Sequence, residues 1–288
     1  MNTITTQIIS DYRSRTFRLN PERQLKSQQD AIDFVNERGF VFFWPIKDIL
    51  LPSLWTATAG DRPVPDIHDD PGHITWRWKD SLLGSQAWYY AKVLRKKSTM
   101  IAMEVVPFFY ALSENYGSPE EDHVILYEQG RLTLEAKLVY QALLDEGPLD
   151  TITLKKVARL SSPENESRFN RALTDLQADF KIVPVGVSEA GSWKYAFIYD
   201  IATRKYPDLI EKTRFINEEH ARVKLLELFL LSMGAVQMHE IVKLFHWEPI
   251  VAAEALKVLM QDEIIHSDVD IEGCDEHWIV LSSLMILK

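Results

Sequence analysis

The sequence predicts a mainly α-helical protein with small β-hairpins, an α+β fold of three tandem winged-helix domains. The back half contains one unit twice, over residues 131–200 and 217–282, and each copy has three helical patterns followed by two short apolar segments. The front of the chain can be divided in the same way. Three helices and a hairpin are the elements of a winged helix, in which the helices enclose a small core and the hairpin closes one edge.

Composition places the chain among ordinary globular proteins. Of its 288 residues, 46% are hydrophobic and 26% are charged,. Apolar runs long enough to cross a membrane are absent, so we expect no membrane association. The amino terminus lacks the apolar stretch of a secretory signal, and Cys274 is the only cysteine,. One thiol forms neither an internal disulfide nor a cysteine-based zinc site, so we expect a cytoplasmic protein.

The two copies in the back half correspond closely. Each begins with an amphipathic helix, LTLEAKLVYQALLDEG and EEHARVKLLELFLLSMG, and Gly147 and Gly234 stand where a helix C-cap belongs,. The third helices match at a constant offset of 83 residues, which aligns Ala172, Leu173, Leu176 and Asp179 with Ala255, Leu256, Leu259 and Asp262. These matches predict a second domain over residues 118–203 and a third over residues 204–288.

The front third predicts a first domain over residues 1–117. A helical pattern over residues 27–38 ends at Gly39, and the apolar strand GFVFFW follows. Further helices are expected at 46–57 and 74–83, and the segment WYYAKVLRKKSTMIAME predicts a hairpin. A last helix at 105–115 is expected to pack between the first two domains.

Basic side chains cluster at the predicted hairpin of the first domain. The net charge of the chain is −10, yet residues 1–110 hold 14 basic and 12 acidic side chains. The excess of acidic residues therefore lies in residues 111–288. Long cationic side chains on a wing can displace counterions from phosphates, and a solvated turn is the alternative interpretation. The cluster predicted to bind DNA is Lys92, Arg95, Lys96 and Lys97.

Two further places in the middle domain could reach DNA. Its third helix carries Arg168 and Arg171, at the position where recognition helices contact base edges or phosphates,. Lys194 lies in the turn of its hairpin. The equivalent third helix of the last domain, EPIVAAEALKVLMQDE, is apolar and acidic. We expect that helix to be structural or to face a protein partner.

The segment GDRPVPDIHDDPGHITWRWK combines prolines, carboxylates, imidazoles and tryptophans. Prolines stiffen a loop, and carboxylates beside imidazoles can perform acid–base chemistry or bind a metal. The spacing of His68 and His73 fits no metal motif, so we expect no metal and no cofactor. A loop that only caps the following helix is the alternative. The aromatic residues of the first domain either fill its core or form a stacking pocket.

The segments GFVFFWPIKDILLPSLW and WYYAKVLRKKSTMIAMEVVPFFYAL, within three tandem winged helices, resemble the AlkZ/YcaQ-type winged-helix DNA glycosylases of bacteria. Members of that family excise alkylated bases, including bulky and cross-linked adducts. The resemblance implies a DNA-repair hydrolase that cleaves the N-glycosidic bond. It also implies double-stranded DNA, intact or damaged, as the partner.

The sequence departs from this family at the catalytic motif. Family members carry Gln-x-Gln or Gln-x-Asp on the early strand, where it is thought to position the attacking water. When the family's Gly-Tyr-Val-Gln-x-Asp pattern is aligned with Gly39, Phe40 and Val41, Phe42 takes the place of the Gln and Trp44 that of the Asp. Neither side chain can orient water. Members also usually end in a small β-barrel, for which the sequence after the third wing leaves no room.

Carboxylates that could replace the motif and a pocket for a base are both predicted in the first domain. The candidate catalytic carboxylates are Asp66, Asp69 and Asp70. The candidate pocket for a base or lesion is formed by Phe42, Trp44, His68, His73 and Trp76. Two alternatives stay open: a non-catalytic transcriptional regulator or partner-binding scaffold, and a hydrolase that uses a metal held by the Asp/His loop.

Overall fold

The computed structural model describes residues 4–67, 69–115, 118–191, 194–274 and 277–285. In this part of the chain one element order recurs three times: helix, strand, two helices and a two-stranded hairpin. Each unit closes with a three-stranded antiparallel sheet in which the last strand lies in the centre. The predicted α+β class is confirmed. The division into three winged-helix domains at the stated boundaries stays a prediction.

The first unit follows the expected order up to its second helix. Ser27 begins α2 with a capping box, in which Asp30 bonds back to the Ser27 amide,. The second helix is shorter than the expected 46–57, because Pro52 precedes Ser53 and the Ser53 hydroxyl caps a helix that starts at Leu54,. The elements are α2 (Gln28–Arg38), β2 (Phe40–Phe42), α3 (Leu54–Ala59), α4 (Ile74–Ser81), β3 (Tyr89–Lys92) and β4 (Ser98–Ile101).

The middle and last units repeat this order. Asp150 caps α8 in the middle unit, and Asn217 caps α12 in the last,. The middle unit consists of α6 (Asp122–Glu128), α7 (Leu134–Glu146), β5 (Leu149–Asp150), α8 (Thr151–Val157), α9 (Glu166–Ala178), β6 (Ile182–Ser188) and β7 (Ala196–Ile201). The last unit consists of α12 (Glu218–Met233), β8 (Ala235–Val236), α13 (Met238–Phe245), α14 (Pro249–Gln261), β9 (Ile265–Val269), β10 (Ile271–Glu272), β11 (Trp278–Leu281) and α15 (Ser282–Met285).

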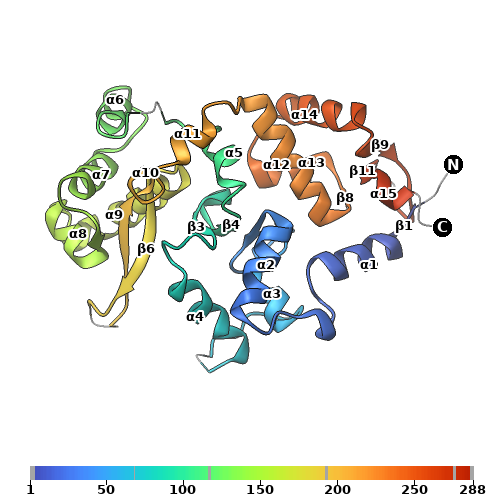
Figure 1. Ribbon diagram of the computed structural model, residues 1–288, viewed down its shortest axis with the longest axis horizontal. Coiled ribbons are helices and arrows are strands. Elements are labelled where there is room, and N and C mark those ends of the chain that lie inside the picture. Colours follow the sequence, from blue (N-terminus) through green and yellow to red (C-terminus); the bar gives the residue numbers. More distant parts are fainter. Residues whose placement is uncertain (1–3, 68, 116–117, 192–193, 275–276, 286–288) are drawn as a thin grey trace.

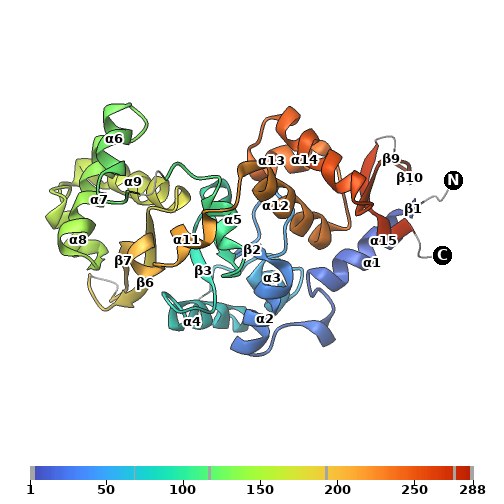
Figure 2. The ribbon, with the colours of Figure 1, turned by 45° about the horizontal axis from the view of Figure 1, so that its top comes forward.

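The first unit lies in space between the middle and last units (Figures 1 and 2). One continuous apolar core runs through the first and last units, and a second core fills the middle unit. The segment α5 (Val106–Tyr110), shorter than the expected helix 105–115, lies against α12 and α11 (Leu209–Thr213). Phe109 of α5 packs on Phe40 of the first unit and Phe180 at the end of α9. Residues from all three units therefore meet around α5.

The amino-terminal segment packs on the last unit. Strand β1 (Ile4–Thr5) pairs with β10, and α1 (Thr6–Thr16) lies along α12. Arg13 donates to the carbonyl oxygen of Met233, the last residue of α12, which satisfies a group that the helix leaves unpaired, and to that of Ala235 in β8,. Among the described residues, helices are all too short or too polar to span a bilayer.

Candidate nucleic-acid interface

The predicted basic hairpin is present, and its tip is a short 3₁₀ turn, Leu94–Lys96, between β3 and β4. Leu94 is buried and its amide donates to the Thr99 hydroxyl, which anchors the turn. Arg95 and Lys96 adopt left-handed backbone angles, φ 54° and 57°, so the chain reverses within three residues,. The side chains of Arg95, Lys96 and Lys97 are exposed. We call residues 92–97 the hairpin tip.

The hairpin tip lies against α9 of the middle unit. The Lys96 ammonium is 2.5 Å from the Asp175 carboxylate, and the Lys92 ammonium donates to the Thr174 hydroxyl at 3.4 Å. The Lys92 amide also donates to the Gln177 side chain. Two predicted DNA-binding elements, about eighty residues apart in sequence, are therefore neighbours.

The same tip also reaches the last unit. The Arg95 guanidinium lies 2.8 Å from Nδ1 of His246, the residue that follows α13. Because arginine can only donate, Nδ1 is the acceptor in this bond,. This bond connects the first and last units at the edge of the hairpin tip.

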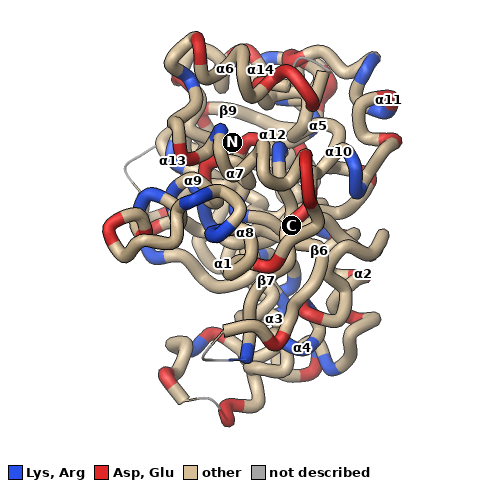
Figure 3. The backbone as a smooth tube through the Cα atoms, turned by 90° about the vertical axis from the view of Figure 1, so that its left-hand side faces the viewer, with Lys and Arg blue, Asp and Glu red and all other residues tan. Residues whose placement is uncertain are grey.

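Helix α9 presents its arginines to solvent. The side chains of Arg168 and Arg171 are 69% and 76% exposed, and their nearest carboxylates are Glu135 at 3.5 Å and Asp175 at 3.6 Å. Pairs this open contribute little, so both side chains are free to turn toward a phosphate. Figure 3 shows basic positions gathered around α8 and α9, interspersed with acidic ones. Lys194 is exposed in the β6–β7 turn, beside Tyr195.

A cavity of about 770 Å³ opens where the three units meet. We call it the junction cleft; its walls include Arg95 and Lys96, Leu112, Ser113 and Glu114, Asp179 and Phe180, and Phe245, His246 and Trp247. His246 adopts a left-handed conformation, φ 62°, at the end of α13. This turn brings Phe245 and Trp247 into a parallel stack, with ring centroids 4.3 Å apart and planes 12° apart.

One carboxyl of the junction cleft is partly buried. Burial raises the pKa of Asp179, and the charge of Lys181 partly opposes that rise. The cleft thus combines two carboxyls, Asp179 and Glu114, with two cations and an aromatic stack. Sequence reasoning missed Asp179 and residues 245–247, because both segments have the pattern of ordinary helix ends. The spacing Phe-His-Trp after an amphipathic helix was the available signal.

The predicted catalytic carboxylates differ in their surroundings. Asp70 receives a bidentate ion pair from Arg62, at 2.6 and 3.0 Å, and accepts from the Gly72 amide. The hydrogen bond from Arg62 is the main reason that the pKa of Asp70 is lowered. Asp66 and Asp69 are exposed. Asp70 therefore caps the short 3₁₀ turn Pro71–His73 before α4, and a catalytic role for Asp66, Asp69 and Asp70 stays a prediction.

Three of the five predicted pocket residues are brought together. The Trp44 ring centroid lies 5.8 Å from that of His73 and 6.2 Å from that of Trp76, which is 43% exposed. Phe42 is fully buried, so its prediction as a pocket residue is wrong: it belongs to the core. His68 lies outside the described residues. Within the described segments, three or more His, Cys, Asp or Glu side chains do not gather in any group that could hold a metal.

A buried lysine, Lys79, lies beside the aromatic group that contains Trp44 and Trp76. Lys79 of α4 is 2% exposed, and its ammonium lies between 4.6 and 5.7 Å from the ring centroids of five aromatic residues,. These rings belong to Phe43, Trp76, Tyr90, Tyr195 and Phe197. We call Lys79, Asp80, Trp44 and these five residues the closed cluster.

Hydrogen bonds within the closed cluster join the first and middle units. Lys79 donates to the Tyr195 hydroxyl at 3.0 Å, Tyr195 donates to Asp80 at 2.9 Å, and Lys79 and Asp80 form an ion pair at 2.8 Å. Burial lowers the pKa of Lys79, against the opposing charge of Asp80, and burial raises the pKa of Tyr195. Sequence analysis did not select Lys79, because its partners on the hairpin of the middle unit follow more than a hundred residues later.

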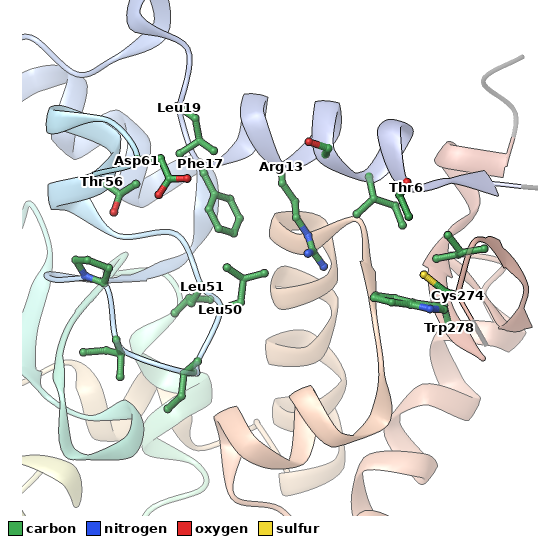
Figure 4. Close-up of a pocket in the computed structure, with 16 residues that line it drawn as sticks. Thr6, Arg13, Phe17, Leu19, Leu50, Leu51, Thr56, Asp61, Cys274 and Trp278 are labelled. Atoms are coloured by element: carbon green, nitrogen blue, oxygen red, sulfur yellow. The ribbon is translucent and has the colours of Figure 1, made fainter. Parts of the chain in front are cut away.

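A second cavity, about 500 Å³ in volume, lies between α1, the loop at 45–51 and the last unit (Figure 4). Its walls are mainly apolar and include Phe17, Leu51 and Trp278. Arg13 borders this cavity, but its guanidinium is bound to the carbonyl oxygens after α12. Cys274 also lies in the wall.

The AlkZ-related family model matches residues 25–246. The chain belongs to this family. The matched range includes the hairpin tip, α9 and Phe245 of the junction cleft, and it ends one residue before Trp247. Among solved structures, Streptomyces sahachiroi DNA glycosylase AlkZ is similar, with a TM-score of 0.61 and 11% sequence identity over 99% of this chain and 73% of that chain. This likeness shows a shared fold. No curated protein matches the sequence significantly.

Proposed function

We propose that this AlkZ-related protein binds double-stranded DNA and recognises damaged, in particular alkylated, DNA. The observation that carries the proposal is the meeting of the hairpin tip with α9, which joins basic side chains from two units on one surface. Cations on such a surface release counterions from the DNA backbone, which favours binding without reading sequence. The similar structure is that of a DNA glycosylase.

Phosphate contacts are assigned to the exposed cations of this surface. Arg168 and Arg171 are 69% and 76% exposed, and Lys97 at the end of the hairpin tip is also exposed. Asp175 lies between Lys96 and Arg171 and weakens the local positive potential. Binding is therefore expected to be modest and strongly dependent on salt. We place the protein in the cytoplasm, where a single unpaired cysteine is usual.

Base excision is the second part of the proposal. In that reaction water adds to the C1′ carbon as the bond to the base breaks, the base leaves with the bonding electron pair, and a carboxylate takes a proton from the water. Asp66 and Asp69 are the candidates for this carboxylate, since Asp70 is bound to Arg62. The pocket would use Trp44, His73 and Trp76.

A non-catalytic role is the second candidate. Phe42 and Trp44 stand where the family resemblance implies the catalytic motif, and Phe42 is fully buried. In addition, Ile250 at the start of α14 is 68% exposed, on a helix whose exposed positions are mostly apolar. A regulator or scaffold that binds DNA through α9 and a protein through α14 fits these two features.

The experiment that separates the candidates is a base-release assay. A duplex with N7-alkylguanine is incubated with the wild type, with Asp66→Ala/Asp69→Ala, and with Asp70→Ala as the matched control, and binding is followed at low and physiological salt. Release that is lost in the double variant and kept in Asp70→Ala supports excision. Binding without release supports the non-catalytic role. Duplex affinity that does not fall with salt contradicts the proposal altogether.

A further inference from the structure

The junction cleft has aromatic and charged residues from different units in its wall. Its stacked pair, Phe245 and Trp247, follows α13 of the last unit, while Arg95 and Lys96 come from the first unit and Asp179 from the middle one. Its volume of about 770 Å³ falls in the range of small-molecule sites,. All three units are needed to form it.

The chemistry of its walls matches an unpaired base with its flanking phosphates. Each nucleobase has a flat face that stacks on an aromatic ring, whatever its sequence, and each carries polar groups at its edge. Trp247 is partly exposed and is held flat by its contact with Phe245. Arg95 and Lys96 supply positive charge beside it.

We propose that the junction cleft receives an unstacked nucleobase, with Trp247 as the stacking partner and Arg95 and Lys96 as the contacts to the flanking phosphates. This inference rests on the proposed binding of DNA alone, and it assigns a displaced base to the junction cleft in place of the pocket of Trp44, His73 and Trp76. Asp179, on the cleft wall, supplies a polar group for the base edge. Damaged or unpaired bases are the easiest to displace, since less stacking and pairing energy is lost.

The position of the cleft supports this assignment. The hairpin tip and α9 that we assign to the DNA backbone form one of its borders, so a base displaced beside those phosphates is close to the cleft. The Arg95–His246 bond lies across the same border. A phosphate that draws Arg95 away from His246 would leave that side of the cleft more open.

The closed cluster is less suited to the same ligand. Its ring faces are already occupied by the Lys79 ammonium, and Lys79 is held by Tyr195 and Asp80. Trp76 offers an exposed edge there, but a base would have to compete with an internal cation. Variants of Trp76 and Trp247 therefore separate the two places.

The test uses the full chain and two duplexes, one fully paired and one with a single bulged 2-aminopurine. Stacking quenches 2-aminopurine, so binding of the bulged duplex to the wild type is expected to lower its fluorescence. Trp247→Leu is expected to abolish this quenching and to weaken binding of the bulged duplex about tenfold. Affinity for the paired duplex should change less than twofold. Trp278→Leu, in the second cavity, is the matched control.

The outcomes distinguish the proposed DNA binding from the proposed base site in the junction cleft. Quenching that is lost in Trp76→Leu and kept in Trp247→Leu overturns the assignment to the junction cleft. So does a wild type that binds both duplexes equally with unchanged fluorescence, although DNA binding itself then stands. Failure of the wild type to bind either duplex overturns both proposals. If Trp247→Leu does not fold, as judged by circular dichroism, Arg95→Gln replaces it, and equal affinity of Arg95→Gln and the wild type for the bulged duplex counts against the cleft.

Discussion

The sheet of the first unit separates two aromatic regions, the open junction cleft and the closed cluster, which is filled by Lys79. In register, Phe40 and Tyr89 flank Ile101 on β4, whereas Val41 and Tyr90 flank Met100. Side chains alternate between the faces of a sheet, so the two sets point apart. Phe40 and Tyr89 face α5, Phe180 and Phe245, and Tyr90 faces Phe43 and the closed cluster.

The difference shows that a rich aromatic sequence does not by itself make a ligand pocket. Most rings of the closed cluster come from residues 43–90, the region that the sequence marked, yet they surround a lysine of the same chain. The junction cleft has fewer rings and stays open, because it lies where three units meet and none of them fills it. The following predictions test this contrast.

Removing the buried ammonium of Lys79 should have the largest effect on stability. Lys79→Ala leaves Asp80 and Tyr195 without their partner and opens a cavity, so we expect the free energy of unfolding to fall by about 3 kcal/mol. Lys79→Met keeps the packing and should cost about 1 kcal/mol. Urea unfolding measures both, with exposed Lys97→Ala as the control. Because both variants remove the cation, equal losses would show that the lost ion pair and hydrogen bond, and not the packing of the side chain, determine the cost.

Alkaline pH should weaken the sheet that separates the two regions. Burial raises the pKa of Tyr90 to about 12, against the hydrogen bond with Ser98. Because the folded pKa lies above the ordinary value, this stabilisation is complete below about pH 10 and is lost between about pH 10 and 12. Tyr90 alone should account for about 2 kcal/mol over that window. Urea unfolding at several pH values should show a flatter decline for Tyr90→Phe, and parallel curves for the two proteins would contradict this assignment.

Duplex binding on the side of the junction cleft should depend on the charges of α9. Arg168→Ala/Arg171→Ala is expected to weaken duplex binding by about 1 kcal/mol, equally for all sequences, and to lower the salt slope by about 2. Fluorescence anisotropy over a range of salt concentrations measures both quantities. Lys212→Ala/Lys257→Ala removes two exposed charges elsewhere and serves as the control. An equal loss in the control would mean that total charge, and not α9, determines binding.

The smallest effect on stability is expected from loss of the Arg95–His246 bond, which borders the junction cleft. Arg95→Gln removes the guanidinium bonded to His246, and an exposed contact of this kind contributes less than about 1 kcal/mol,. The midpoint of thermal unfolding should therefore change little, while binding of the bulged duplex weakens. A large drop in that midpoint would mean that Arg95 is mainly structural.

Local features of the fold followed from the sequence, because short-range rules determine them. A helix over residues 27–38 was expected, and the structure has it at 28–38, where Ser27 and Asp30 form its capping box,. The repeated helix and hairpin pattern was visible for the same reason. The expected helix at 46–57 was wrong over most of its length, since Pro45 and Pro52 and the Ser53 cap outweigh the apolar spacing,.

The candidate site was predicted only in part. The basic tip and the arginines of α9 were visible as charge clusters, and Trp44, His73 and Trp76 as a dense aromatic region. The pairing of Asp70 with Arg62 was not foreseen, although both lie in one loop. A sequence lists the carboxylates of a loop but does not show which of them a cation will bind.

The sequence by itself thus determined the α+β class, the repeated unit and the basic hairpin, because periodicity, caps and turns act over a few residues. Only the tertiary structure decided which groups meet. It placed Lys79 beside Tyr195 and Arg95 beside His246, pairs that are 116 and 151 residues apart. The physical reason is that these contacts arise when separately folded units bury their apolar faces against one another, and packing of that kind has no local pattern to reveal it.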